Sequence, residues 1–273
     1  MKSYLIFISQ FAVPLSLFCF SITHAAEAKS LEGLSLGIGI ERLKYEEDAS
    51  DIGVKSHSQG TNTLLKLMDQ KGFGNIFAGI KGIFPIHTPD DKEKWTEYGE
   101  LRQSNTMEYY RQKMDIYAGY SLMSWLSPYT GLSWLEAEQK RENFIIYDVP
   151  VSGSATEKLR SYDLLFGIYG CLPFGDRVQL DYRIDYLVPV DSTVKNNYLF
   201  DFEVKDNNGY TLEITNGIRY IFKESLSIYM EFNWGKIHWD QSDWATLFGG
   251  IRVKTPDNDS TYTGAILGIT YHL

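Results

Sequence analysis

The stretch from Tyr210 to Trp239 reads YTLEITNGIRYIFKESLSIYMEFNWGKIHW, and it decides the fold of this chain. Apolar and polar side chains alternate along it, break at Lys223–Ser225, and then alternate again as far as Trp234. Because successive side chains of a β-strand point to opposite faces of the sheet, the pattern predicts a hairpin of two long strands with one apolar and one polar face.

The composition of the two faces indicates what surrounds the hairpin. The apolar face has large aromatic side chains near its ends and consists of Tyr210, Leu212, Ile214, Ile218, Tyr220, Phe222, Leu226, Ile228, Met230, Phe232 and Trp234. The polar face spaces Glu213, Arg219 and Glu231 among small residues. A soluble β-sandwich also alternates, but long arms with these two faces are typical of a closed barrel with lipid outside and a polar lumen inside.

Composition narrows the class of protein further. The chain has 273 residues, of which 44% are hydrophobic and 15% aromatic, and its formal net charge is −9. This length suits one large β domain. Tyr and Trp, present 19 and 6 times, favour bilayer interfaces. The acidic balance excludes nucleic acid as a partner, since a nucleic-acid contact face needs Lys and Arg.

The first residues read as a secretory signal. Lys2 supplies a positive start, an apolar run follows from Leu5 to Ile22, and small residues lead up to Ala26. We therefore expect a signal peptide at residues 1–26 and a barrel domain at residues 27–273. The alternative is a membrane anchor helix. Cleavage removes Cys19, so the mature chain would hold only Cys171 and no internal disulfide.

The same alternation recurs along the chain in about ten segments. We expect strands at residues 34–45, 61–69, 76–86, 107–122, 129–141, 158–172, 178–190, 210–222, 226–239 and 261–273. The breaks between them are alternately long and short, which is the asymmetry of outer-membrane barrels with long extracellular loops and short periplasmic turns. The prediction is an all-β transmembrane antiparallel up-and-down β-barrel in a Gram-negative cell outer membrane, with outer-membrane lipids around it.

Two features lie at the ends of strands. Residues 245–253, within the last long loop, are expected to extend a hairpin above the membrane. The final alternating strand, Thr261–Leu273, resembles the C-terminal signal that the outer-membrane assembly machinery reads, which predicts that machinery as a partner.

Charged side chains on three neighbouring strands are expected to project into the lumen, because a charge on the lipid face costs about 2–4 kcal/mol near the midplane. This lumen polar cluster consists of Asp181, Arg183, Asp185, Glu213, Arg219 and Glu231. One interpretation is a proton relay, a binding site or a selectivity constriction. The other is an ion-pair network that fills the lumen, because a barrel of ten strands lies near the size that side chains can fill.

The histidines offer a second kind of site. His87 lies close to Asp90 and Asp91, and His238 lies close to Asp240, in each case at the expected rim of the barrel. A histidine with a carboxylate can act as a general base. We find no Gly-rich phosphate loop, nucleophile elbow or zinc motif, so no cofactor, no metal and no catalytic residue is assigned.

The layout resembles the omptins, ten-stranded outer-membrane proteases. The segments that look alike are the strand–turn–strand unit from Met107 to Arg141 and the hairpin from Tyr210 to Trp234. The resemblance implies an Asp pair in the second outer loop, where this chain has Asp90 and Asp91. It also implies an Asp-x-His in the fourth outer loop, residues 191–209, but this loop contains no His, so the catalytic base is unmatched.

The sequence therefore predicts an integral outer-membrane protein with a structural, surface-interaction or narrow-pore (porin-like) role. The alternative is an omptin-like or lipid-modifying hydrolase with its active site at the rim.

Overall fold

A computed structural model describes residues 33–49, 53–197, 202–205, 208–242, 244–246, 252–253 and 255–272. The expected signal peptide at residues 1–26 and the terminal Leu273 lie outside these ranges. None of the described residues forms a helix with the length and hydropathy that crossing a bilayer requires.

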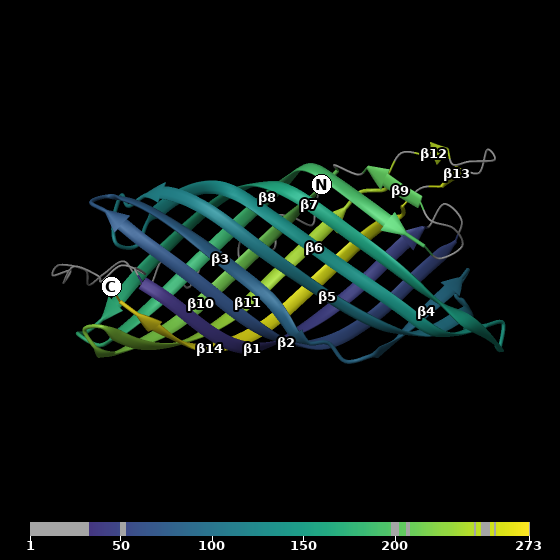
Figure 1. Cartoon of the computed structure of the whole chain (residues 1–273), viewed down its shortest axis with the longest axis horizontal. Coiled ribbons are helices and arrows are strands. Elements are labelled where there is room, and N and C mark those ends of the chain that lie inside the picture. Colours follow the sequence, from purple (N-terminus) through teal and green to yellow (C-terminus); the bar gives the residue numbers. More distant parts are fainter. Residues whose placement is uncertain are drawn as a thin grey trace.

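Ten of the described strands form a closed antiparallel ring, as the sequence predicts (Figure 1). Their bounds are β1 Gly33–Ala49, β2 Val54–Phe73, β3 Ile76–His87, β5 Glu100–Tyr120, β6 Ser127–Ile146, β7 Val149–Phe174, β8 Val178–Asn196, β10 Gly209–Lys223, β11 Leu226–Trp239 and β14 Asp257–Tyr271. Each strand pairs with its neighbours in the chain, and β1 pairs with both β2 and β14, which closes the ring. Closure leaves no sheet edge inside the membrane.

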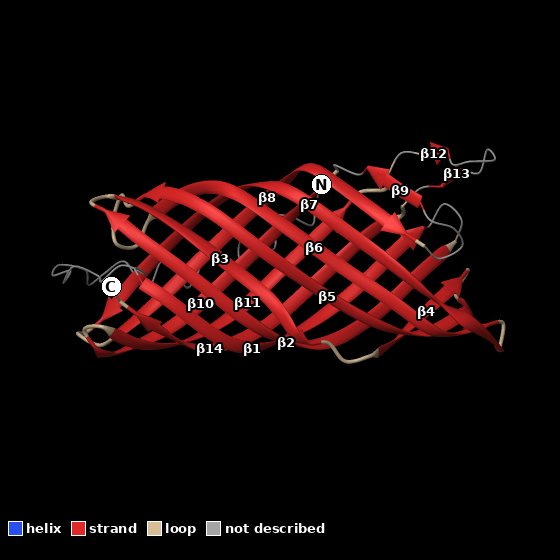
Figure 2. Ribbon diagram, in the orientation of Figure 1, coloured by secondary structure: helices blue, strands red, loops and turns tan. Residues whose placement is uncertain are grey.

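Four short strands extend the barrel at one end only, which we call the mouth (Figures 1 and 2). β4 (Asp91–Glu97) fills the place between β2 and β5 above the end of β3, and β9 (Phe202–Lys205) pairs with β8. β12 (Ala245–Thr246) and β13 (Arg252–Val253) pair with each other, which confirms the hairpin expected within residues 245–253. The opposite end carries the tight turns, and we call it the turn end.

The hairpin that decides the fold has the two faces that the sequence predicts. Ile218 pairs with Met230 and Ile214 with Trp234, and these four side chains are on the outer face. Near the mouth, Ile237 and Trp239 are apolar but are buried inside the lumen. Glu213, Arg219 and Glu231 are buried in the lumen.

The outer surface shows where the membrane begins and ends. On β1 the outward side chains are apolar up to Ile40, which is 59% exposed, and polar from Arg42 onward. On β6 the outward positions change in the same way after Trp134, where Glu136 and Glu138 follow. A belt of exposed apolar side chains that ends in aromatics is what contact with acyl chains requires. The mouth-side ends of the strands stand beyond this apolar belt.

In four segments expected as long loops, most of the described residues belong to strands. Residues 46–60, 87–106, 147–156 and 191–209 contain the mouth-side ends of β1, β2, β5, β7 and β8 as well as β4 and β9. The sequence prediction was wrong there for a physical reason. Beyond the bilayer both faces of a strand can be polar. Hydrogen bonding between the strands therefore continues there without the alternation of apolar and polar residues by which the membrane-spanning parts were recognised.

The lumen is filled with side chains. Along β5 the inward residues run from Met107 and Tyr109, through Arg111, Lys113 and Asp115, to Tyr117. The first pair belongs to an apolar cluster near the mouth, made of Leu43, Tyr45, Met107, Tyr109, Leu135, Ala137, Ile237, Trp239 and Tyr262. The last belongs to a cluster nearer the turn end, made of Phe77, Tyr117, Tyr129, Leu165, Tyr169 and Leu187. The charged residues between them form a polar layer.

Candidate functional site

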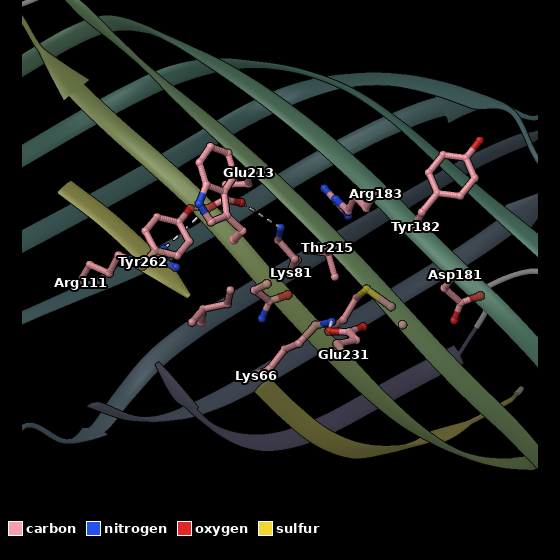
Figure 3. Close-up of a pocket in the computed structure, with 15 residues that line it drawn as sticks. Lys66, Lys81, Arg111, Asp181, Tyr182, Arg183, Glu213, Thr215, Glu231 and Tyr262 are labelled. Carbon is pink, nitrogen blue, oxygen red and sulfur yellow. Dashed lines mark hydrogen bonds and ion pairs between the residues drawn. The ribbon is translucent and has the colours of Figure 1, made fainter. Parts of the chain in front are cut away.

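The polar layer joins cations and carboxylates from seven of the ring strands (Figure 3). Among the described residues, its ion pairs include the cations Lys66, Lys81, Arg111, Lys113, Arg183 and Arg219, and the carboxylates Glu41, Asp115, Asp181, Asp185, Glu213 and Glu231. Six positive charges therefore meet six negative charges. A buried group of charges is tolerated when each charge has a partner of opposite sign.

Lys81 is at the centre of this layer. Its Nζ lies 3.0 Å from Asp115, 3.2 Å from Asp185 and 3.6 Å from Glu213. Oxygens of these three carboxylates lie within 4.8 Å of one another, a spacing that could hold a metal ion. Lys113 also reaches the group, with its Nζ 2.6 Å from Glu213. Two ammonium groups thus supply the positive charge that a metal would bring.

Arg111 connects the polar layer to the apolar cluster near the mouth. Its Nε and Nη2 donate to the two oxygens of Glu41 at 3.1 and 2.5 Å. Its guanidinium carbon lies 3.5 Å from the ring centroid of Tyr262, whose hydroxyl donates to Glu213. The ring of Tyr262 has room because residue 235 is glycine: a Cβ there would lie 2.0 Å from the ring.

Three further pairs extend toward the turn end. Arg219 donates from Nε to Asp181 at 2.9 Å and from Nη1 to Thr270 at 2.9 Å. Lys66 donates to Glu231. Arg183 donates to Asp185 at 2.8 Å, and its guanidinium carbon lies 4.5 and 4.6 Å from two aromatic ring centroids, those of Tyr117 and Tyr129.

The structure places all six residues of the predicted lumen polar cluster within this layer. The other six members of the layer come from β1, β2, β3 and β5 and are Glu41, Lys66, Lys81, Arg111, Lys113 and Asp115. Sequence reasoning did not include these six in the cluster. The alternation of each strand already indicates that these side chains point inward. Which inward side chains lie at the same height in the lumen depends on strand tilt and register, which the alternation does not give.

The space left inside the polar layer is small. A cavity of about 40 Å³ lies among Lys66, Lys81, Asp181, Arg183 and Glu231. A water molecule needs at least about 10–15 Å³ of such volume, so the cavity has room for a few waters. The larger hollow of the described residues, about 680 Å³, is a cleft at the mouth.

His238 lines this mouth cleft and is bracketed by carboxylates. Its Nδ1 lies 2.6 Å from Asp259 and its Nε2 lies 3.0 Å from Asp240. Lys236 also contacts Asp259, at 3.0 Å. Sequence reasoning paired His238 with Asp240, but it missed Asp259, which the β11–β14 register brings opposite His238.

The other histidine site expected from the sequence is not assembled in the same way. His87 is exposed at the end of β3, and no ion pair between described residues includes it. Asp91 is the first residue of β4 and pairs with Met107.

Comparison with known proteins agrees on the fold. No family model matches the sequence, and no curated protein matches it. Among solved structures, the outer membrane protease OmpT from Escherichia coli superposes with a TM-score of 0.70 at 11% identity, over 91% of this chain and 100% of OmpT. The transport unit of the autotransporter AIDA-I from Escherichia coli matches with a TM-score of 0.44 at 12% identity, over 98% of this chain and 97% of that chain.

The ring of strands, its apolar belt and the likeness to OmpT define the class: this chain is an outer-membrane β-barrel with the ten-stranded architecture of OmpT. At 11% identity the likeness concerns the fold alone.

Proposed function

We propose that this protein is a closed outer-membrane barrel with a structural or surface-interaction role, and that its lumen passes no solute. The observation that carries the proposal is the balanced polar layer between two apolar clusters. A narrow pore needs a continuous aqueous path with sites that ions can enter and leave. Here the cations and carboxylates of the layer are bound to one another, and the cavity between them is about 40 Å³.

The mouth end supports a role at the cell surface. The strands there continue beyond the apolar belt, and two of the hairpins at this end, β4–β5 and β6–β7, hydrogen-bond to each other through the amide of Tyr147 and the carbonyl of Arg102. Apolar side chains are exposed at both tips, with Tyr98 at 79% and Tyr147 at 62%. Exposed apolar groups clustered on an ordered tip are common at protein contact surfaces.

The proposal is tested by liposome swelling with small sugars and amino acids, with a porin of known conductance as the positive control. We expect the swelling rate of liposomes with this protein to equal that of empty liposomes. Swelling that increases with the amount of folded protein would contradict a closed lumen.

A second candidate function is favoured by the geometry of His238. Asp259 orients the ring through Nδ1, and if a substrate displaces Asp240 from Nε2, that nitrogen can take a proton from water in the mouth cleft. This would make the protein a rim hydrolase.

Fluorogenic peptides and phospholipids, incubated with the protein in detergent, test this second candidate. Hydrolysis that is lost in His238→Ala and kept in His87→Ala would support it. Intact substrates with the native protein, or equal rates in both variants, would remove it.

A further inference from the structure

A second, smaller pocket lies between the apolar cluster near the mouth and the mouth cleft. Its volume is about 30 Å³, and the aromatic side chains of Tyr45, Tyr109 and Trp239 line it. The rings of Tyr45 and Tyr109 meet edge to face, with centroids 5.5 Å apart. The pocket lies beyond Arg42 on β1, outside the apolar belt, so whatever binds there comes from the mouth.

The pocket is lined by acidic side chains. Glu47 and Glu157 both line it. The cation beside them is Arg141, but its guanidinium is already engaged by Glu93, at 2.7 Å from Nε and 3.2 Å from Nη2, and lies 3.9 Å from Glu47. One cation therefore lies among three acidic side chains, which favours the binding of a second cation.

Two buried polar atoms at the pocket have no partner among the described residues. Glu47 is 6% exposed, and while one of its oxygens accepts from the Tyr45 hydroxyl, Oε2 accepts from nothing. Trp239 is 3% exposed, and its indole Nε1–H donates to nothing. An unpaired buried polar atom costs about 1–3 kcal/mol, and native proteins leave few of them. Two side chains that line the pocket thus each carry one buried polar atom without a partner, an acceptor on Glu47 and a donor on Trp239.

The pocket borders the mouth cleft. Glu47 and Asn258 line both this pocket and the cleft of about 680 Å³. A small molecule that enters the cleft therefore lies next to Glu47, one of the residues that the two spaces share.

We propose that this pocket binds a compact primary amine that carries a neutral oxygen, of the amino-alcohol class. An ammonium group supplies a positive charge that favours the ionised form of Glu47 and an N–H for its Oε2, and the aromatic walls favour a cation. The oxygen accepts from Trp239 Nε1–H. The neighbouring carboxylates disfavour a carboxylate in that place, and a quaternary ammonium has no N–H to donate. The volume of the pocket restricts the ligand to a few non-hydrogen atoms.

The test is calorimetric titration of the folded protein in detergent at pH 8 with four small probes. Ethanolamine has both groups, ethylamine lacks the oxygen, glycine carries a carboxylate, and choline lacks the N–H. We expect ethanolamine to bind with a dissociation constant on the order of 1 mM, which is reasonable for a ligand this small. Ethylamine should bind about 10-fold more weakly, and glycine and choline should not bind measurably. Equal affinity for ethanolamine and choline, or no saturable binding of ethanolamine, would overturn the proposal.

Two variants localise the binding. Trp239→Phe keeps the aromatic surface but removes the donor, so it should reduce ethanolamine affinity to that of ethylamine and leave ethylamine affinity unchanged. Glu47→Gln should weaken both amines at least 10-fold. Heat-modifiable mobility on gels verifies that each variant is folded. If Trp239→Phe weakens both amines equally, the indole N–H is not a ligand contact and the proposed chemistry is wrong.

The amine could be a free molecule or the headgroup of a lipid. Titration with phosphoethanolamine and with soluble short-chain phosphatidylethanolamine distinguishes these sources. Binding of ethanolamine alone indicates a free amine, whereas tighter binding of the lipid indicates a headgroup. The result does not depend on whether the lumen conducts.

Discussion

At the residue scale, the protein depends on buried charges that are neutralised by partners far away in the sequence. Lys81 on β3 serves carboxylates of β5, β8 and β10, so a single side chain connects distant strands across the lumen. Removing one member of a buried ionic group leaves the others uncompensated, which costs more than the group contributes when intact.

Replacement of Lys81 by Met is expected to destabilise the folded barrel by about 3–5 kcal/mol, because three carboxylates then share the remaining cations. The measurement is equilibrium unfolding in urea in the presence of lipid. Lys71→Met, at an exposed position of β2 near the turn end, is the matched control and should change stability by less than about 0.5 kcal/mol. Equal effects of the two substitutions would contradict the ion-paired layer.

The buried side chain of Glu47, which lies outside the apolar belt, makes the stability of the folded protein depend on pH. Burial, with the nearby Glu157 carboxylate, raises the pKa of Glu47 to about 8 from an ordinary value of 4.5, although Arg141 opposes the shift. Glu93 and Tyr45 are the other titratable groups near it. Between these two values the folded chain keeps a proton that the unfolded chain has released. Stability due to Glu47 therefore falls as the pH rises from 4.5 to 8 and levels off above 8.

Glu47→Gln removes this dependence. We expect the free energy of unfolding of the variant to increase relative to that of the native protein as the pH rises from 5 to 8. The increase is at most about 1.4 kcal/mol per pH unit. Thermal unfolding followed by circular dichroism across this range measures the difference. A constant difference between the two proteins would show that Glu47 does not hold a proton at neutral pH.

At the scale of the element, each strand must present apolar side chains to lipid on one face and side chains that pack together in the lumen on the other. Gly235 on β11 is an example, because the ring of Tyr262 occupies the space that a side chain would take. Tyr262 in turn covers Arg111. A small residue in the wall thus lets an aromatic side chain lie flat against it beside the polar layer.

Gly235→Ala is expected to destabilise the barrel by about 1–3 kcal/mol, since the added Cβ would lie 2.0 Å from the Tyr262 ring, which is itself packed on both sides. Gly60→Ala is the control: it is also in a strand, and a Cβ there meets nothing within 4 Å. Urea unfolding of both variants separates the effect of the clash from that of losing a glycine. If both variants behaved alike, Tyr262 would not occupy that space.

A charge on the outer face tests the membrane boundary. Leu36→Arg, within the apolar belt of β1, should cost about 2–4 kcal/mol, whereas Thr61→Arg, on the outer face of β2 beyond the belt, should cost close to nothing. Refolding yield into vesicles and urea midpoints report the difference. A large loss for Thr61→Arg would mean that the belt extends further toward the mouth.

At the scale of the whole molecule, alternation in the sequence predicted the ring, its closure and which face of the hairpin is apolar between Tyr210 and Trp234. It identified Glu213 and Glu231 as inward because lipid excludes charge from the other face. It did not predict the mouth-side extensions such as β4, because polar strands beyond the bilayer do not alternate in hydropathy. It also did not predict which charges meet: Lys66 and Glu231 are 165 positions apart, and only tilt and register bring them together.

The central claim is that a neutral, ion-paired layer closes the lumen, and single-channel recording in planar bilayers tests it most directly. After insertion of the folded protein, verified by its heat-modifiable mobility, we predict a membrane current equal to that of the bare bilayer in 1 M KCl at 100 mV. Stepwise, reproducible conductance that is proportional to the amount of inserted protein would contradict the claim.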